Sequence, residues 1–198
     1  MKKIVIAGGI GAGKTAVTDW LRARGFVVVD ADLVAHDVVE PGRPALRALR
    51  DAFGDAVLDA QGRLDRAFVA DVVFHDPTAL RRLNAITHGY IGIEIARQLS
   101  ETRGRGVFIA LPLYRPEHRD LFGVDEVWAV QVEPETAVAR LVDGRGFTEA
   151  DARARLEIQM TNDERERLAD RLIPNEGNLE ELHAHLERQL TESGLNDG

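Results

Sequence analysis

The sequence predicts an α/β fold in which one parallel β-sheet is flanked by helices. Two observations support this prediction: short, continuous apolar runs recur along the chain, and amphipathic helical patterns separate them. Such runs are typical of strands buried on both faces, and strands that alternate with helices form parallel sheets. We therefore expect five strands, at residues 4–7, 26–30, 107–111, 126–132 and 171–173.

The first strand leads through a glycine-rich segment into a helix. That helix is expected to begin near Lys14 and to end before Gly25, because glycine is the usual residue just beyond a helix end. Val17, Leu21 and Trp20 are expected on its inner face. With the second strand, this segment forms one βαβ unit.

The interval 40–104 interrupts the alternation of strands and helices. A turn at Glu40 is followed by three helical patterns, at 44–53, 65–74 and 77–101, with no strand between them. We therefore expect an inserted helical subdomain within one domain that spans residues 1–198.

Two helical patterns follow the fourth strand, and a short glycine-containing segment separates them. Thr148 precedes acidic residues at 149 and 151, which is a typical helix N-terminus. We expect a helical hairpin that forms a lid over residues 137–160, with Arg153 and Arg155 on a solvated face. The last six residues, SGLNDG, are expected to fray.

Composition limits the class of protein. The chain has 198 residues, 44% of them apolar, and no cysteine, which excludes disulfides and thiolate metal sites and fits a cytoplasmic location. A net charge of −8 argues against nucleic-acid binding, and no apolar run approaches the length of a membrane span. We expect small-molecule partners, and a monomer or a weak homo-oligomer.

The pattern Gly8-x-x-x-x-Gly13-Lys14-Thr15 matches the Walker A motif of the P-loop NTPase fold. It follows a predicted strand and begins a helix, where backbone N–H groups and the positive helix end can bind phosphates. Lys14 would reach the β- and γ-phosphates, and the Thr15 hydroxyl would bind Mg²⁺. The motif predicts an ATP and Mg²⁺ site formed by Gly9, Ile10, Gly11, Ala12, Gly13, Lys14, Thr15 and Ala16.

A dinucleotide-binding loop is the competing interpretation. Gly11, Gly13 and Ala16 also fit G-x-G-x-x-[GA], and Asp30 lies roughly 20 residues further on, as expected for a ribose contact. Lys14 and Thr15 favour the triphosphate, because a dinucleotide loop does not need the lysine. A glycine-rich turn without a ligand is the remaining alternative.

Among P-loop proteins, the sequence favours a small-metabolite kinase. The N-K-x-D base-recognition motif of GTPases is absent. An ATPase motor would have a long apolar strand that ends in aspartate, but the VFIALPL run has no carboxylate at its end. A kinase needs the loop, a carboxylate to orient the acceptor hydroxyl, and arginines to neutralise the transferring phosphoryl group. All three kinds of residue are present.

The segments GGIGAGKT, VVVDADLVAHDVVEPGRPAL and LADRLIPNEGN together resemble the dephospho-CoA kinase family over about residues 1–190. The resemblance implies transfer of the ATP γ-phosphate to the ribose 3′-hydroxyl of dephospho-CoA, the last step of coenzyme A synthesis. It implies that Asp32 is the base for that hydroxyl and that the 40–104 insertion binds the substrate. It also implies roles for the lid arginines Arg140 and Arg145, for His88 in substrate binding, and for Asn175 in ATP binding, at the end of the pattern that precedes the family's adenine-side loop. Gln159, Arg165 and Asp170 align with the same closing pattern.

The chain departs from the family pattern at three places. Gly89 stands where the family usually has proline after the histidine. The family usually has a glutamate four residues after the proline that ends its third strand, which is Pro112 here, but Pro116 occupies that position and Glu117 comes one place late. Gly144 occupies the second lid-arginine position, so that Arg145 lies one residue beyond it.

Structural roles are the alternatives for several of these residues. Asp32 could cap a helix that begins near Leu33, Asp30 could end a strand, and His88 could be a structural histidine. His183 and His185 are assigned to the surface, because two residues two apart on a helix point to different sides. Two alternative functions stay open: a P-loop phosphotransferase for another acceptor, and an ATP-binding module without catalysis.

Overall fold

A computed structural model of the chain describes residues 1–196. The chain divides into two compact units, and each is described by itself. The first unit contains Met1–Val29 and the chain from Thr102 onward, and the second contains Asp30–Glu101.

The first unit is built on a five-stranded sheet, which confirms the predicted α/β fold. The strand order is β2-β3-β1-β4-β5, and β1 pairs in parallel with β3 and β4, as β4 does with β5. Phe108 and Trp128 lie on either side of β1, level with Ile4 and Ile6. The strands are Lys2–Gly8 (β1), Val27–Asp30 (β2), Gly106–Ala110 (β3), Glu126–Gln131 (β4) and Arg171–Pro174 (β5).

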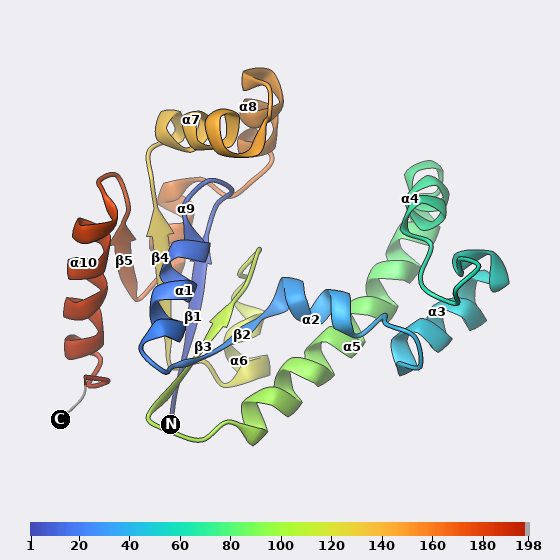
Figure 1. The fold of residues 1–198 in the computed structure, drawn as a ribbon, viewed down its shortest axis with the longest axis horizontal. Coiled ribbons are helices and arrows are strands. Elements are labelled where there is room, and N and C mark those ends of the chain that lie inside the picture. Colours follow the sequence, from blue (N-terminus) through green and yellow to red (C-terminus); the bar gives the residue numbers. More distant parts are fainter. Residues whose placement is uncertain (197–198) are drawn as a thin grey trace. The chain divides into compact units, whose positions relative to one another are not determined.

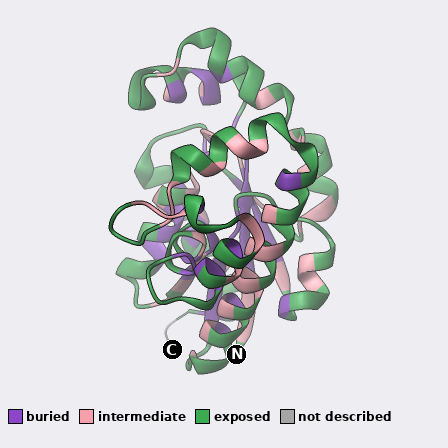
Figure 2. Ribbon diagram, turned by 90° about the vertical axis from the view of Figure 1, so that its right-hand side faces the viewer, coloured by how far each residue is buried: buried purple, intermediate pink, exposed green. Residues whose placement is uncertain are grey.

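Burial differs between the central and the edge strands. Every residue of β3 is buried, and β1 is buried from Ile4 onward. The central strands are largely purple, the colour of buried residues, in Figure 2. The prediction that all apolar runs are buried on both faces was wrong for β2, where Val27 is 43% exposed. The cause is position: β2 lies at an edge of the sheet, so one side of the strand has no neighbour.

Helices surround this sheet in the first unit. Helix α10 packs against β5 and α1 (Figure 1), and its buried leucines Leu182, Leu186 and Leu190 join the main core. The helices of the unit are Lys14–Ala23 (α1), Glu117–Phe122 (α6), Pro134–Arg145 (α7), Glu149–Glu157 (α8), Asn162–Leu168 (α9) and Leu179–Glu192 (α10).

The C-terminal segment does not fray as predicted. Ser193 and Leu195 are 5% and 3% exposed, and Leu195 belongs to the main core. A Cβ atom on Gly106 would lie 3.0 Å from a Leu195 methyl group, so the missing side chain at 106 leaves the room that Leu195 fills. Residues 197–198 of the predicted tail lie outside the described residues.

Helices α7 and α8 contact each other and form the expected hairpin. Thr148 caps α8, because its side chain accepts a hydrogen bond from the Asp151 N–H at 3.1 Å. Arg153 bridges Glu135 and Glu149 on the exposed side of the hairpin. This side is therefore solvated but carries ion pairs.

Glu126 holds together the start of β4, the start of β5 and the end of α10. Its carboxylate accepts hydrogen bonds from Lys2 at 2.5 Å, Arg171 and Ser193 at 2.8 Å each, and Trp128 at 3.0 Å. Burial alone would raise the pKa of Glu126, but these four hydrogen bonds lower it to about 2.

The second unit is helical. Helix α5 contacts α2, α3 and α4. Its elements are Ala31–Asp37 (α2), Pro44–Phe53 (α3), the 3₁₀ turn Asp55–Val57 (η1), Arg66–His75 (α4) and Pro77–Glu101 (α5). The unit starts at Asp30, ten residues before the 40–104 insertion that the sequence suggests, because α2 packs on α5.

No helix within residues 1–196 is both long enough and apolar enough to cross a membrane.

Candidate phosphate-binding site

The glycine-rich loop connects β1 to α1 and takes a backbone shape that only glycine adopts easily. Gly11 and Gly13 have φ angles of +75° and +91°, in the left-handed region. A Cβ atom on Gly11 would lie 2.9 Å from the Ala137 carbonyl oxygen, and one on Gly13 would lie 2.2 Å from the Asn175 amide nitrogen. The loop is therefore closely surrounded at both glycines.

Lys14 folds back over the start of this loop. Its ammonium group donates hydrogen bonds to the carbonyl oxygens of Gly8 at 2.5 Å and Gly9 at 3.1 Å. Helix α1 starts directly after Gly13, with no side-chain cap and no acidic residue in its first turn. Its first N–H groups and its positive end thus face the loop, an arrangement that suits a bound phosphate.

Asn175 and Arg140 support the loop from the far end of the chain. The buried Asn175 amide donates to the Ala12 carbonyl oxygen at 2.8 Å, and Arg140 Nη2 donates to the Asn175 carbonyl oxygen at 2.8 Å. Arg140 Nη1 is buried without a hydrogen-bond partner in the described part of the chain, and lies 3.8 Å from where a Cβ of Gly13 would be. A buried, unpaired guanidinium nitrogen is costly, and an anion beside Gly13 would satisfy it.

Two further side chains approach the loop. Gln159 lies in the connection between α8 and α9, and Arg165 lies in α9. Gln159 Oε1 accepts the Ile10 N–H at 2.9 Å, and Arg165 Nη2 would lie 2.7 Å from a Cβ on Gly9. Burial lowers the pKa of the Arg165 guanidinium. The sequence related both residues only to a family pattern and did not show that they lie beside the loop.

A local signal could have indicated the helix that carries Arg165. Thr161 and Glu164 form a capping box at the start of α9: the Thr161 side chain accepts from the Glu164 N–H, and the Glu164 side chain accepts from the Thr161 N–H. The T-x-x-E pattern is visible in the sequence. It predicts the start of the helix but not its packing against Gly9.

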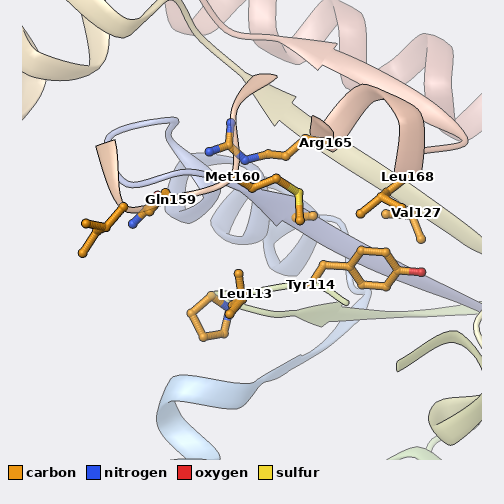
Figure 3. Close-up of a pocket in the computed structure, with 11 residues that line it drawn as sticks. Leu113, Tyr114, Val127, Gln159, Met160, Arg165 and Leu168 are labelled. Atoms are coloured by element: carbon orange, nitrogen blue, oxygen red, sulfur yellow. The ribbon is translucent and has the colours of Figure 1, made fainter. Parts of the chain in front are cut away.

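A cavity of about 320 Å³ opens beside the start of the loop, within the first unit. Ala7, Gly8, Gln159 and Arg165 border it, and Figure 3 shows Leu113 and Tyr114 lying across the cavity from Met160. The remaining lining residues are Pro112, Val127, Ile158 and Leu168. Apart from Gly8 of the loop motif and the family-pattern residues Gln159 and Arg165, the sequence did not indicate that the residues bordering the cavity belong to a site.

The two arginines of the predicted lid are placed differently from each other. Helix α7 continues through Gly144 and ends at Arg145, followed by Gly146 in the left-handed conformation. At 3.6 residues per turn, Arg145 is rotated by roughly 140° from Arg140 around the helix. Arg145 is exposed and makes no ion pair within residues 1–196, whereas Arg140 reaches Asn175.

Asp32 and His88 lie in the second unit. Asp30, not Asp32, caps α2, since its side chain accepts the Asp32 N–H at 3.0 Å. The exposed Asp32 carboxylate makes no hydrogen bond or ion pair in the described chain. Because Asp30 caps α2, the structural alternative in which Asp32 caps the helix is wrong.

His88 is exposed on α5, which runs uninterrupted through Gly89.

Residues for a divalent cation are few. Among residues 1–196, no three or more His, Asp or Glu side chains cluster closely enough to hold a metal ion. Mg²⁺ commonly takes only one or two protein oxygens and completes its shell with phosphates and water. The exposed Thr15 hydroxyl, at the start of α1, fits that role.

Comparison with known proteins gives consistent results. The family model for dephospho-CoA kinase matches residues 3–181. A dephospho-CoA kinase of Corynebacterium glutamicum is 43% identical over 97% of both chains. The crystal structure of TT1252 from Thermus thermophilus has a TM-score of 0.79 at 31% identity and covers 96% of this chain and 97% of its own. The dephospho-CoA kinase structure from Campylobacter jejuni shares the fold, with a TM-score of 0.67 at 21% identity and 96% of each chain covered. The chain belongs to the dephospho-CoA kinase family.

Proposed function

We propose that the protein transfers the γ-phosphoryl group of ATP to the 3′-hydroxyl of the ribose in dephospho-CoA, which forms CoA and ADP. The observation that carries this proposal is the phosphate loop with the unpaired Arg140 nitrogen beside it, in a chain that matches the family model over residues 3–181. In the reaction, the 3′-oxygen forms a bond to the γ-phosphorus, the bond from that phosphorus to the β–γ bridging oxygen breaks, and the hydroxyl loses its proton.

The loop and its neighbours would bind the donor phosphates. The loop N–H groups and the start of α1 bind phosphate oxygens, and Lys14 moves from the Gly8 and Gly9 carbonyl oxygens onto the β- and γ-phosphates. Arg140 Nη1 gains the acceptor that it lacks in the free protein. Asn175 holds the loop at Ala12, and it would contribute to ATP binding through this contact with the loop.

Mg²⁺ would be held by the Thr15 hydroxyl together with phosphate oxygens and water. When bound, the ion neutralises negative charge on the phosphates.

Asp32 would take the proton of the acceptor hydroxyl. Two features support this role: helix capping is done by Asp30, and the Asp32 carboxylate is exposed and has no other partner in the described chain. His88 would contact the acceptor from α5, within the 40–104 subdomain that binds the substrate.

The lid formed by residues 137–160 would act on the transferring group. Arg140 and Arg145 are its cations, and their charge matters most in the transition state, where negative charge spreads over the phosphoryl oxygens. We place this activity in the cytoplasm, in keeping with a chain that has no cysteine. We also propose that the protein acts as a monomer or weak homo-oligomer.

A single-turnover assay with γ-labelled ATP tests the proposal. The acceptors are dephospho-CoA, CMP, shikimate and gluconate, and mass spectrometry locates the new phosphate. We expect transfer only to dephospho-CoA, on the ribose 3′-oxygen. Binding of ATP without transfer to dephospho-CoA would contradict the proposal, and the departures at Gly89, Glu117 and Arg145 would then be examined for another acceptor.

A further inference from the structure

The cavity beside the phosphate loop has two chemically different parts. One part is apolar, and we call it the apolar slot. Its residues come from both sides of the cavity: Pro112, Leu113, Tyr114, Ile158, Met160 and Leu168. The other part is polar and consists of Gly8, Gln159 and Arg165, which also adjoin the loop. Pockets for small ligands commonly have this composition and a volume of about 300–1,000 Å³.

The apolar slot exposes side chains that water solvates poorly. Leu113 is 47% exposed and Ile158 is 86% exposed, although both border a concave surface. Tyr114, in contrast, is 7% exposed, and its ring lies 6.0 Å from the His118 ring. The slot therefore combines a fixed aromatic residue with apolar side chains that a flat, weakly polar group would cover.

The cavity that contains the slot borders the start of the loop, beside the Lys14 ammonium group. Gly8 borders the cavity, and its carbonyl oxygen is 2.5 Å from the Lys14 ammonium group, which in Walker A loops reaches the β- and γ-phosphates. Arg165 borders the cavity and also lies close to Gly9 of the loop, so it adjoins both the cavity and the loop. With ATP on the loop, a group in the slot would therefore lie close to the phosphoryl group that is transferred.

We infer that the apolar slot binds the adenine base of the acceptor. This inference rests on the proposed function, in which the 3′-oxygen attacks the γ-phosphorus. In dephospho-CoA only the ribose ring separates that oxygen from the base, whereas the pantetheine arm begins beyond the 5′-diphosphate. The part of the acceptor that must lie beside the γ-phosphate is the adenosine, and its flat base fits between Met160 and the wall formed by Leu113 and Tyr114.

The two methionines of the chain make a direct test possible. Met160 lines the slot, and Met1 is 49% exposed at the N-terminus, so methyl-¹³C-methionine labelling gives one reporter in the slot and one internal control. The protein is first saturated with Mg²⁺ and a non-hydrolysable ATP analogue. Dephospho-CoA, AMP and pantetheine are then added separately, and dephospho-CoA binding is measured in parallel by calorimetry.

The expected result is an upfield ring-current shift of the Met160 methyl signal with dephospho-CoA and with AMP, no shift with pantetheine, and an unchanged Met1 signal. Heat of binding without a Met160 shift overturns the inference and leaves the proposed function standing. A shift with pantetheine alone, or a full shift with the ATP analogue alone, also overturns it, because the arm or the donor base would then fill the slot. Absence of dephospho-CoA binding overturns the proposed function as well.

Variants give a second readout. Leu113→Asp places a charge in the slot, and Leu121→Asp is the matched control, since Leu121 is 64% exposed on α6 and does not border the cavity. We expect Leu113→Asp to raise the dissociation constants of dephospho-CoA and of AMP by the same factor, at least tenfold, and to leave the affinity for the ATP analogue unchanged. An effect on dephospho-CoA but not on AMP, or equal effects of the two variants, contradicts the inference.

Discussion

Replacing Glu126 with glutamine should make the stability of the protein less dependent on pH between pH 6 and pH 3. The Glu126 side chain is only 14% exposed and accepts hydrogen bonds from Lys2, Arg171, Ser193 and Trp128. Its pKa falls from 4.5 to about 2 on folding. Because the folded-state pKa is the lower one, the carboxylate stabilises the protein above its unfolded-state pKa, and this stabilisation is lost as the pH falls toward 2.

The magnitude follows from that pKa difference. At 1.36 kcal/mol for each pKa unit, ionised Glu126 contributes about 3 kcal/mol to the free energy of unfolding at neutral pH. Near pH 3 the same calculation leaves about 1 kcal/mol. The stability difference between wild type and Glu126→Gln should therefore shrink by about 2 kcal/mol between pH 6 and pH 3.

Urea unfolding at a series of pH values, followed by circular dichroism, measures this difference. Glu187→Gln is the control, because Glu187 pairs with Arg24 at the surface and its side chain is 49% exposed. A surface pair of this kind contributes about 0–1 kcal/mol. A stability difference between wild type and Glu126→Gln that stays constant from pH 6 to pH 3 would refute the reasoning, because the carboxylate would then titrate alike in the folded and unfolded chains.

The remaining predictions concern catalysis. Lys14→Ala should lower kcat at least a hundredfold with an unchanged melting temperature, and near-normal turnover with Mg²⁺-ATP would rule out the phosphate role. Asp32→Asn should lower kcat far more than it changes ATP affinity; Asp37→Asn, an exposed carboxylate on the same helix, is the control, and equal effects would argue against a base at 32. Arg140→Ala and Arg145→Ala should each lower kcat more than they raise the acceptor KM; if only Arg140→Ala does so, Arg145 has no catalytic role.

Local sequence determined the phosphate loop and most element boundaries. The order of strand, glycines and Lys14 is covalent, and the φ angles of Gly11 and Gly13 are available to glycine whatever surrounds them. Thr148 likewise caps α8 through a contact three residues away. Patterns of this kind are readable because the interacting groups are neighbours in the chain.

Packing between distant segments determined the features of the structure that local sequence patterns did not show. The sequence could not show that β2 lies at the edge of the sheet, or that Leu195 fills the space beside Gly106. The sequence also could not show that Gln159 and Arg165 lie beside the loop.

The residues around the loop show the same division. Asn175 holds the Ala12 carbonyl oxygen across 163 positions of the chain, and Gln159 holds the Ile10 N–H across 149. The motif alone predicts that phosphate binds here. The groups that hold the loop and line the slot beside it come from segments that only the folded sheet brings together, because hydrogen bonds and apolar contacts of this range leave no periodic pattern in the sequence.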